Sequence, residues 1–180
     1  DRNGVAFWYS SNGSFFTYSG GLPRPIINPN QRWFASNLAM GQEDKIYGSF
    51  IGEKNEVLWF FPNPDSDEIF PSVAPFECAR YIAYNYMEDH WNIGTYDRTA
   101  MIDRGSYDSP IGTSSGDGNK YIWYMETGAS EEGEARTCYV VSAPIDLDGG
   151  TILTYCNRFQ HDVKFGSDTV GGIRISHMSG

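Results

Sequence analysis

The chain has 180 residues, with 13 Lys and Arg against 23 Asp and Glu, so its formal net charge is -10. That length suits one domain, or one domain and part of a second, with enough chain for a hydrophobic core. Hydrophobic residues make up 40% of the chain, which excludes a disordered tail. No apolar run reaches the about 18 residues of a membrane-spanning helix, and the acidic balance argues against a protein that wraps nucleic acid.

The kind of hydrophobic residue predicts the fold class. Aromatic residues make up 16% of the chain, and Ile and Val far outnumber Leu. β-branched and aromatic side chains fit a pleated, half-buried surface. The 20 Gly and 9 Pro indicate many turns. We therefore expect an all-β chain built from antiparallel hairpins.

The first hairpin is predicted over residues 4–18, where Asn12 and Gly13 lie between two aromatic runs. Residues 20–25 contain two prolines and indicate an extended crossing segment. Residues 31–44 are a candidate for a short helix.

The second hairpin pairs residues 45–50 with residues 56–61. Residues 57–61 are apolar at every position, which predicts a strand covered on both faces. Residues 62–75 contain four prolines and three acidic residues, Asp65, Asp67 and Glu68. A solvated surface loop is the favoured interpretation, because the segment lacks the glycine and terminal glutamate of a calcium-binding loop.

A third hairpin pairs residues 80–86 with residues 90–96, and a short strand follows at residues 99–103. A fourth hairpin pairs residues 110–113 with residues 120–127. A polar boundary at residues 128–134 precedes further expected strands.

About ten short strands before residue 130 predict a sandwich, a barrel or a propeller. They amount to about two and a half propeller blades, whereas a closed propeller needs at least about four. We expect a partial β-propeller of antiparallel hairpin blades over residues 1–129, and the start of a second, β-sandwich-like domain over residues 130–180. On this interpretation the chain is a piece of a longer one.

The sequence shows no motif for catalysis, metal or cofactor binding. The nucleophile elbow of serine hydrolases, the phosphate-binding loop and zinc-hydrolase histidine spacings are all missing from it. His161 beside Asp162 favours a surface strand end over an acid–base pair. The three cysteines, Cys78, Cys138 and Cys156, are far apart and odd in number, so we expect buried free thiols. We therefore expect that the protein is not an enzyme and binds no cofactor.

Two constellations have alternative interpretations. Glu56 and Arg98 are either a buried pair that ties strands together or two exposed strand-end charges. The densest aromatic cluster either packs between stacked sheets, which is favoured, or forms sugar-binding platforms. Its members are Tyr81, Tyr84, Tyr86, Trp91 and Tyr96. Alternation places Tyr84 and Tyr86 on one face of their strand and Asn85 on the other.

Several segments, in order, resemble the β-propeller tail proteins of short-tailed bacteriophages, known as tail-nozzle or packaged-DNA stabilisation proteins. The run from Asn55 to Pro62, with Glu56 and Trp59, is similar to a hairpin of that family. Further similar positions follow along the chain to about residue 177, and they include Tyr84, Tyr86, Trp91, Arg98, Asp148, Gly149, Arg158 and Asp162.

The resemblance implies a non-enzymatic virion component that is assembled in the host cytoplasm. It implies several copies, six in that family's nozzles, around the tail axis, docked below the portal and adaptor proteins. Such a protein closes the tail channel, retains packaged DNA and later conducts it as passing cargo, without a membrane anchor. The alternative expectation is a carbohydrate-binding propeller module for host attachment.

Overall fold

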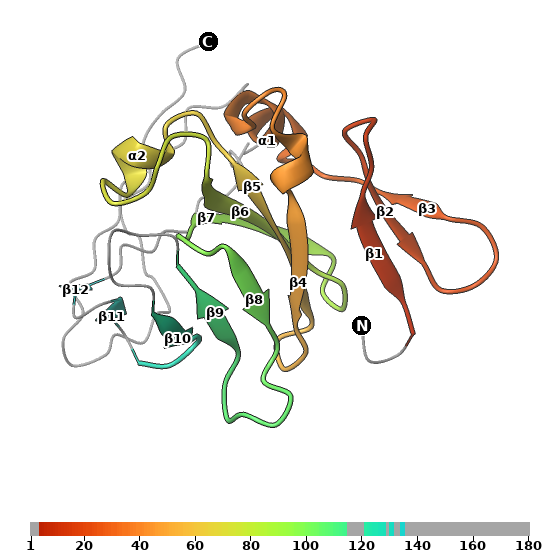
Figure 1. The fold of residues 1–180 in the computed structure, drawn as a ribbon. Helices are drawn as coiled ribbons and strands as arrows, with labels where there is room; N and C mark the ends of the chain where they lie inside the picture. Colours follow the sequence, from red (N-terminus) through yellow and green to blue (C-terminus); the bar gives the residue numbers. More distant parts are fainter. Residues whose placement is uncertain (1–3, 115–120, 129, 132–133, 136–180) are drawn as a thin grey trace, which may run out of the picture. The chain divides into compact units, whose positions relative to one another are not determined.

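The computed structural model describes residues 4–114, 121–128, 130–131 and 134–135. The chain divides into two compact units, Asp1–Glu134 and Ala135–Gly180, and nearly all described residues belong to the first. The described part is mostly β, with antiparallel sheets and a few short helices (Figure 1). The predicted all-β class is therefore confirmed in its coarse form. The strands expected beyond residue 135 lie outside the described residues.

The first sheet contains β1 (Ala6–Tyr9), β2 (Phe15–Tyr18) and β3 (Arg24–Ile26), in that order. The predicted hairpin is confirmed, and its turn contains Gly13 at φ 83°, a conformation that favours glycine. The predicted crossing segment is extended and forms the edge strand β3. Pro25 is tolerated there because an edge strand has an unpaired side.

The central sheet has the order β4-β5-β6-β7. Its strands are β4 (Tyr47–Ile51), β5 (Glu56–Pro62), β6 (Cys78–Asn85) and β7 (His90–Thr95). Both predicted hairpins are confirmed as consecutive antiparallel pairs. Asn55 and Asp89 have positive φ in the two turns, a conformation that Asn and Asp adopt more readily than other non-glycine residues.

The third sheet contains β8 (Ala100–Ile102), β9 (Ile111–Thr113) and β10 (Ile122–Tyr124). Its order is β10-β9-β8, and both pairs are antiparallel, as the predicted strand and fourth hairpin require. A separate two-stranded sheet follows, with β11 (Ser130–Glu131) and β12 (Glu134–Ala135).

The helices of the described part are short. α1 (Gln31–Asn37) confirms the candidate helix, and the 3-10 turn η1 (Glu43–Lys45) leads into β4. The Gln31 side chain donates a hydrogen bond to the Gly13 carbonyl at 2.6 Å, which ties α1 to the first hairpin. None of the helices in the described residues is long and apolar enough to cross a membrane.

The segment after β5 is largely the predicted surface loop, with two features that were not predicted. It contains the helical turn α2 (Ser66–Ile69), and the side chains of Asn63 and Ser66 are completely buried. The Asn63 amide oxygen accepts from the Ala79 backbone N–H, and the Ser66 hydroxyl donates to the Ala74 carbonyl at 2.8 Å. These two side chains satisfy backbone groups, whereas three of the four prolines, and also Asp67 and Glu68, are exposed, so the segment is a surface loop with two buried anchors.

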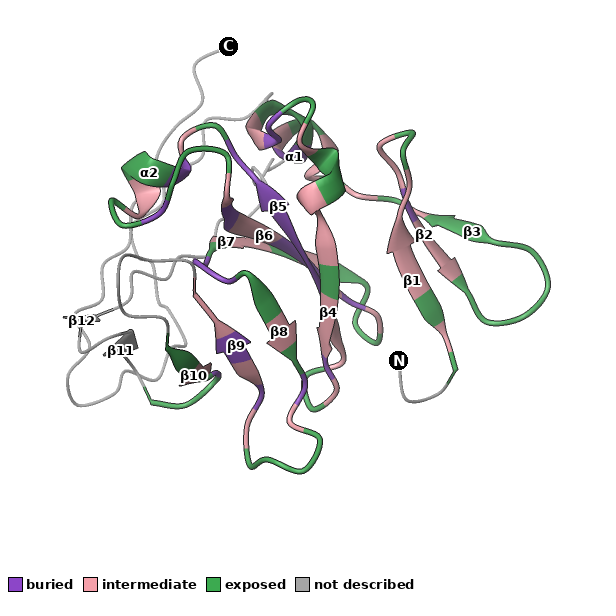
Figure 2. Ribbon diagram, viewed as in Figure 1, coloured by how far each residue is buried: buried purple, intermediate pink, exposed green. Residues whose placement is uncertain are grey.

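The core lies on both faces of β5, which is buried along nearly its whole length (Figure 2). Val57, Trp59 and Phe61 belong to one cluster, with side chains of the first sheet and α1. Leu58 and Phe60 belong to another, with side chains that include Met101 and Trp123 of the third sheet. Side chains alternate along a strand, so the first and third sheets pack on opposite faces of the central sheet (Figure 1).

Candidate functional site

The predicted aromatic cluster is divided between the two faces of the central sheet. Tyr84, Tyr86 and Trp91 lie on the face toward the first sheet, whereas Tyr81 and Tyr96 lie on the face toward the third. This follows from strand alternation, because position 81 differs in parity from positions 84 and 86. The predicted placement of Tyr84 and Tyr86 on one face is confirmed by their shared neighbour Phe7.

The rings between the first and central sheets form what we call the inter-sheet aromatic layer. It consists of Phe7, Tyr9, Phe15, Phe34, Trp59, Tyr84, Tyr86 and Trp91. The Trp91 ring centroid lies 4.9 Å from that of Tyr84 and 5.1 Å from that of Phe15. Tilted ring pairs at such distances stabilise a core beyond their buried area. The favoured packing interpretation is thus confirmed for these rings.

The polar atoms of this layer also have partners. The Tyr84 hydroxyl donates to the Asp89 carboxylate at 2.9 Å, and the Trp91 indole N–H donates to the Ile27 carbonyl at 2.9 Å. Burial, with a contribution from the Asp89 hydrogen bond, raises the pKa of Tyr84 to about 12. The layer has the properties of an internal interface, and its covered rings do not offer an open platform to a sugar.

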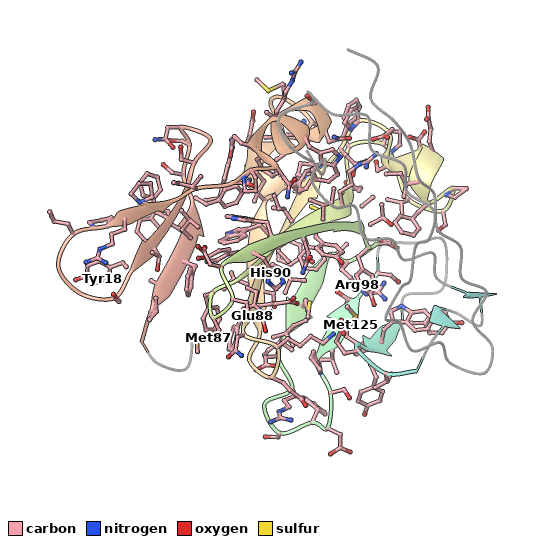
Figure 3. All side chains as sticks on the ribbon, turned by 180° about the vertical axis from the view of Figure 1, so that it is seen from behind. Tyr18, Met87, Glu88, His90, Arg98 and Met125 are labelled. Atoms are coloured by element: carbon pink, nitrogen blue, oxygen red, sulfur yellow. The ribbon has the colours of Figure 1, made fainter. Side chains whose placement is uncertain are left out.

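Arg98 packs against the cluster that contains Leu58 and Phe60, and it is 5% exposed there. Its guanidinium carbon lies 4.4 Å from the centroid of the Tyr96 ring and 5.9 Å from that of the Trp123 ring. Its Nε donates to Met125 Sδ at 3.1 Å, and both residues are labelled in Figure 3. Arg98 therefore links the end of the central sheet to the third sheet through cation–π contacts.

The contacts of Glu56 do not include Arg98, the candidate partner from the sequence. It begins β5 opposite Ile51 and accepts a hydrogen bond from Asn92 at 3.3 Å. Burial raises the pKa of its carboxyl, although Lys54 acts in the opposite direction. The Tyr47 hydroxyl donates to the Arg98 carbonyl, and Tyr47 pairs with Phe60 in β5.

The interpretation of Glu56 and Arg98 as a pair is therefore wrong, and the alternative of two exposed charges is wrong for Arg98, which is buried. From position 56 to position 60 is four residues of strand, roughly 13 Å. The two residues lie at different ends of β5, and each is held by its own neighbours. Sequence periodicity identifies the face of a strand and cannot give the position along it at which a distant residue packs.

A small cavity of about 220 Å³ lies between η1, β4 and the segment before β6. It is lined by Lys45, Tyr47, Glu77, Cys78 and Thr99. Lys45 forms an ion pair with Glu77 at 2.9 Å, so its charge is already partnered. Burial raises the pKa of the Cys78 thiol to about 12. A thiol of that pKa is protonated at neutral pH and is a weak nucleophile.

The expected free thiol is confirmed for Cys78, which is buried and unbridged. Cys138 and Cys156 lie outside the described residues, as do Asp148, Gly149, Arg158 and Asp162.

Asp65, the first acidic residue after β5, is held by hydrogen bonds within the protein. Its carboxylate accepts from Asn63 at 2.8 Å and from Arg80 at 2.7 Å. These hydrogen bonds lower the pKa of the Asp65 carboxyl, and the one from Asn63 has the larger effect. Within the described ranges, no group of three or more His, Cys, Asp or Glu is placed to hold a metal ion.

The apolar outward sides of the first and third sheets were not predicted from the sequence. Tyr18, Ile102, Ile122 and Tyr124 are large hydrophobic residues that remain exposed on these sheets. Residues 5–9 are apolar or aromatic at every position, and residues 15, 16 and 18 are aromatic. A continuous apolar run, the pattern that predicts a doubly covered strand at residues 57–61, is therefore also present in residues 5–9.

No protein-family model, curated protein or solved structure matches this chain.

Proposed function

We propose that the chain is a non-enzymatic structural protein of a short-tailed phage virion, similar to a tail nozzle. One observation carries the proposal: sheets that follow one another in the chain pack face to face on the two sides of β5. Successive blades of a β-propeller pack in this way, and a four-stranded antiparallel meander such as β4–β7 has the form of one blade. The sequence resemblance to phage tail proteins supports the same interpretation.

In this proposal, several copies surround the tail axis below the portal and adaptor proteins. The assembly helps to close the channel, retains packaged DNA and conducts it on ejection. The net charge of -10 supports such a role, because bound phosphates add affinity through counterion release while acidic walls keep DNA passage reversible.

The test is the location of the protein in particles. Antibodies raised against the chain and coupled to gold should label the tails of gradient-purified virions under the electron microscope. Mass spectrometry of the same particles should detect the chain at a constant ratio to the portal protein. Antibodies against the major capsid protein provide the control, because they should label heads. Absence of the chain from purified virions would reject the proposal.

A further inference from the structure

The turn between β1 and β2 places an asparagine directly before a glycine at the surface. Asn12 is exposed, and Gly13 follows it with φ 83°. In an Asn-Gly pair the backbone nitrogen of the glycine can attack the side-chain amide carbon of the asparagine, because glycine has no side chain to hinder the approach. The two reacting groups belong to neighbouring residues, so the attack is intramolecular and closes a small succinimide ring.

The reaction needs water alone as a co-reactant. A bond forms between the Gly13 nitrogen and Asn12 Cγ, and the amide nitrogen of Asn12 leaves as ammonia, which carries away the proton from Gly13. Water then adds to one of the two ring carbonyls and breaks one carbon–nitrogen bond. One cleavage leaves an aspartate, and the other leaves an isoaspartate, in which the main chain runs through Cβ.

In the folded turn, hydrogen bonds hold both reacting groups. The Gly13 N–H donates to the Ser10 carbonyl at 2.9 Å. The Asn12 amide oxygen accepts from the Ser14 N–H at 3.0 Å. The Gly13 carbonyl accepts from Gln31 at 2.6 Å, so α1 holds the same residue from outside the hairpin. The attack requires a free glycine nitrogen and a rotated amide, so these bonds must open first.

We propose that Asn12 is a site of spontaneous deamidation, that opening of the turn limits its rate, and that Gln31 controls the opening. The exposed position admits water and base, while the hydrogen bonds make the reactive geometry a minor state. A loop tip opens locally at a much smaller free energy than the whole chain unfolds. The inference does not depend on the virion role.

The two products should affect the turn differently. An aspartate keeps the length of the main chain, and its carboxylate accepts from the Ser14 N–H as the amide oxygen does. An isoaspartate adds a carbon to the main chain before Gly13, which enlarges the ring closed by the hydrogen bond to Ser10. The Gly13 carbonyl then shifts relative to Gln31. The isoaspartate form should therefore lose the link between the first hairpin and α1.

Peptide mapping by mass spectrometry measures the rate on the full chain at mildly alkaline pH. The folded chain should be deamidated at Asn12, at least about tenfold more slowly than the chain unfolded in urea. Gln31→Ala removes the donor on α1 and should raise the rate in the folded chain severalfold. Arg32→Ala is the matched control at the next, exposed position of the helix, and it should leave the rate unchanged. Asn63 precedes a proline, which lacks the attacking N–H, and should stay unmodified.

Ion exchange separates the two products, and urea unfolding compares them. The midpoint should be lower for the isoaspartate form and close to wild type for the aspartate form. Circular dichroism reports whether each variant is folded, and Gln31→Glu, which keeps the size and removes the donor, replaces Gln31→Ala if it is not. An unmodified Asn12 in the folded chain would overturn the inference. So would equal rates in the folded and unfolded chains, or equal rates in the Gln31 and Arg32 variants.

Discussion

At the scale of single residues, Glu56 makes the stability of the fold depend on pH. Burial raises the pKa of its carboxyl above the ordinary 4.5, so the folded state favours the protonated form. The free energy of unfolding should therefore fall as pH rises from below 4.5 through the raised pKa. Urea unfolding measures this effect. Relative to wild type, the free energy of unfolding of the Glu56→Gln variant should rise between pH 3 and pH 7.

Asp65 provides a control of opposite sign in the same experiment. Hydrogen bonds lower the pKa of its carboxyl below the ordinary 3.8, so its stabilising contribution is present above 3.8 and is lost as pH falls through the lowered pKa. Asp65→Asn should therefore lose stability relative to wild type between pH 3 and pH 7. Equal trends in both variants would contradict the assigned environments.

Gly94 is a position where close packing requires glycine. A Cβ there would lie 2.6 Å from ring atoms of Tyr81, a distance that forces the ring to move. Gly94→Ala should cost about 1–3 kcal/mol of unfolding free energy through overpacking. Gly48→Ala is the matched control in another strand of the same sheet, where the nearest atom lies at 3.6 Å. Its effect should stay within about 1 kcal/mol. Equal losses in the two variants would reject the argument from packing.

At the scale of elements, β5 separates two interfaces within one strand. Trp59 contacts the first sheet through Phe15, with ring centroids 4.7 Å apart, and Phe60 contacts the other cluster, stacked on Tyr47 at 4.9 Å. Replacing either residue by Leu should cost about 1–3 kcal/mol of unfolding free energy. In hydrogen exchange, Trp59→Leu should reduce protection mainly in β1–β3, and Phe60→Leu mainly in β8–β10. Each variant is the control for the other, and a uniform loss in both would contradict the separation.

The hairpins were predictable from the sequence because turn chemistry is local. Asn12 and Gly13 specify a tight turn between two apolar runs, and the turn residues Asn55 and Asp89 tolerate positive φ. The buried anchors of the loop after β5 were not predictable, because they depend on contacts far along the chain. Asn63, for example, accepts a hydrogen bond from the backbone N–H of Ala79, near the start of β6.

The candidate site was predictable only in part, for the same reason. The apolar run of β5 identified a doubly covered strand, and strand parity gave the shared face of Tyr84 and Tyr86. Arg98 contacts two rings and a thioether that come from two segments, one around residue 96 and one at residues 123–125. Such a set has no spacing signature in the sequence.

At the scale of the whole molecule, the net charge of -10 predicts that the chain does not hold DNA. Nonspecific affinity comes from phosphate neutralisation by Lys and Arg, and it is strongest at low salt. We expect no mobility shift of duplex DNA even at roughly 50 mM salt. A basic DNA-binding protein run alongside should shift the same DNA. A shift caused by this chain would contradict the role of a passive conduit.

The two-sided strand β5 also sets an order of assembly during synthesis. β1 and β2 leave the ribosome before β5 and β7, and the face of their sheet that carries Phe15 is covered only after Trp59 and Trp91 have been made. Until then, this sheet exposes aromatic rings on both of its sides, a state prone to aggregation. We expect the nascent chain to recruit chaperones until β7 is complete, and to need them less once the central meander has formed.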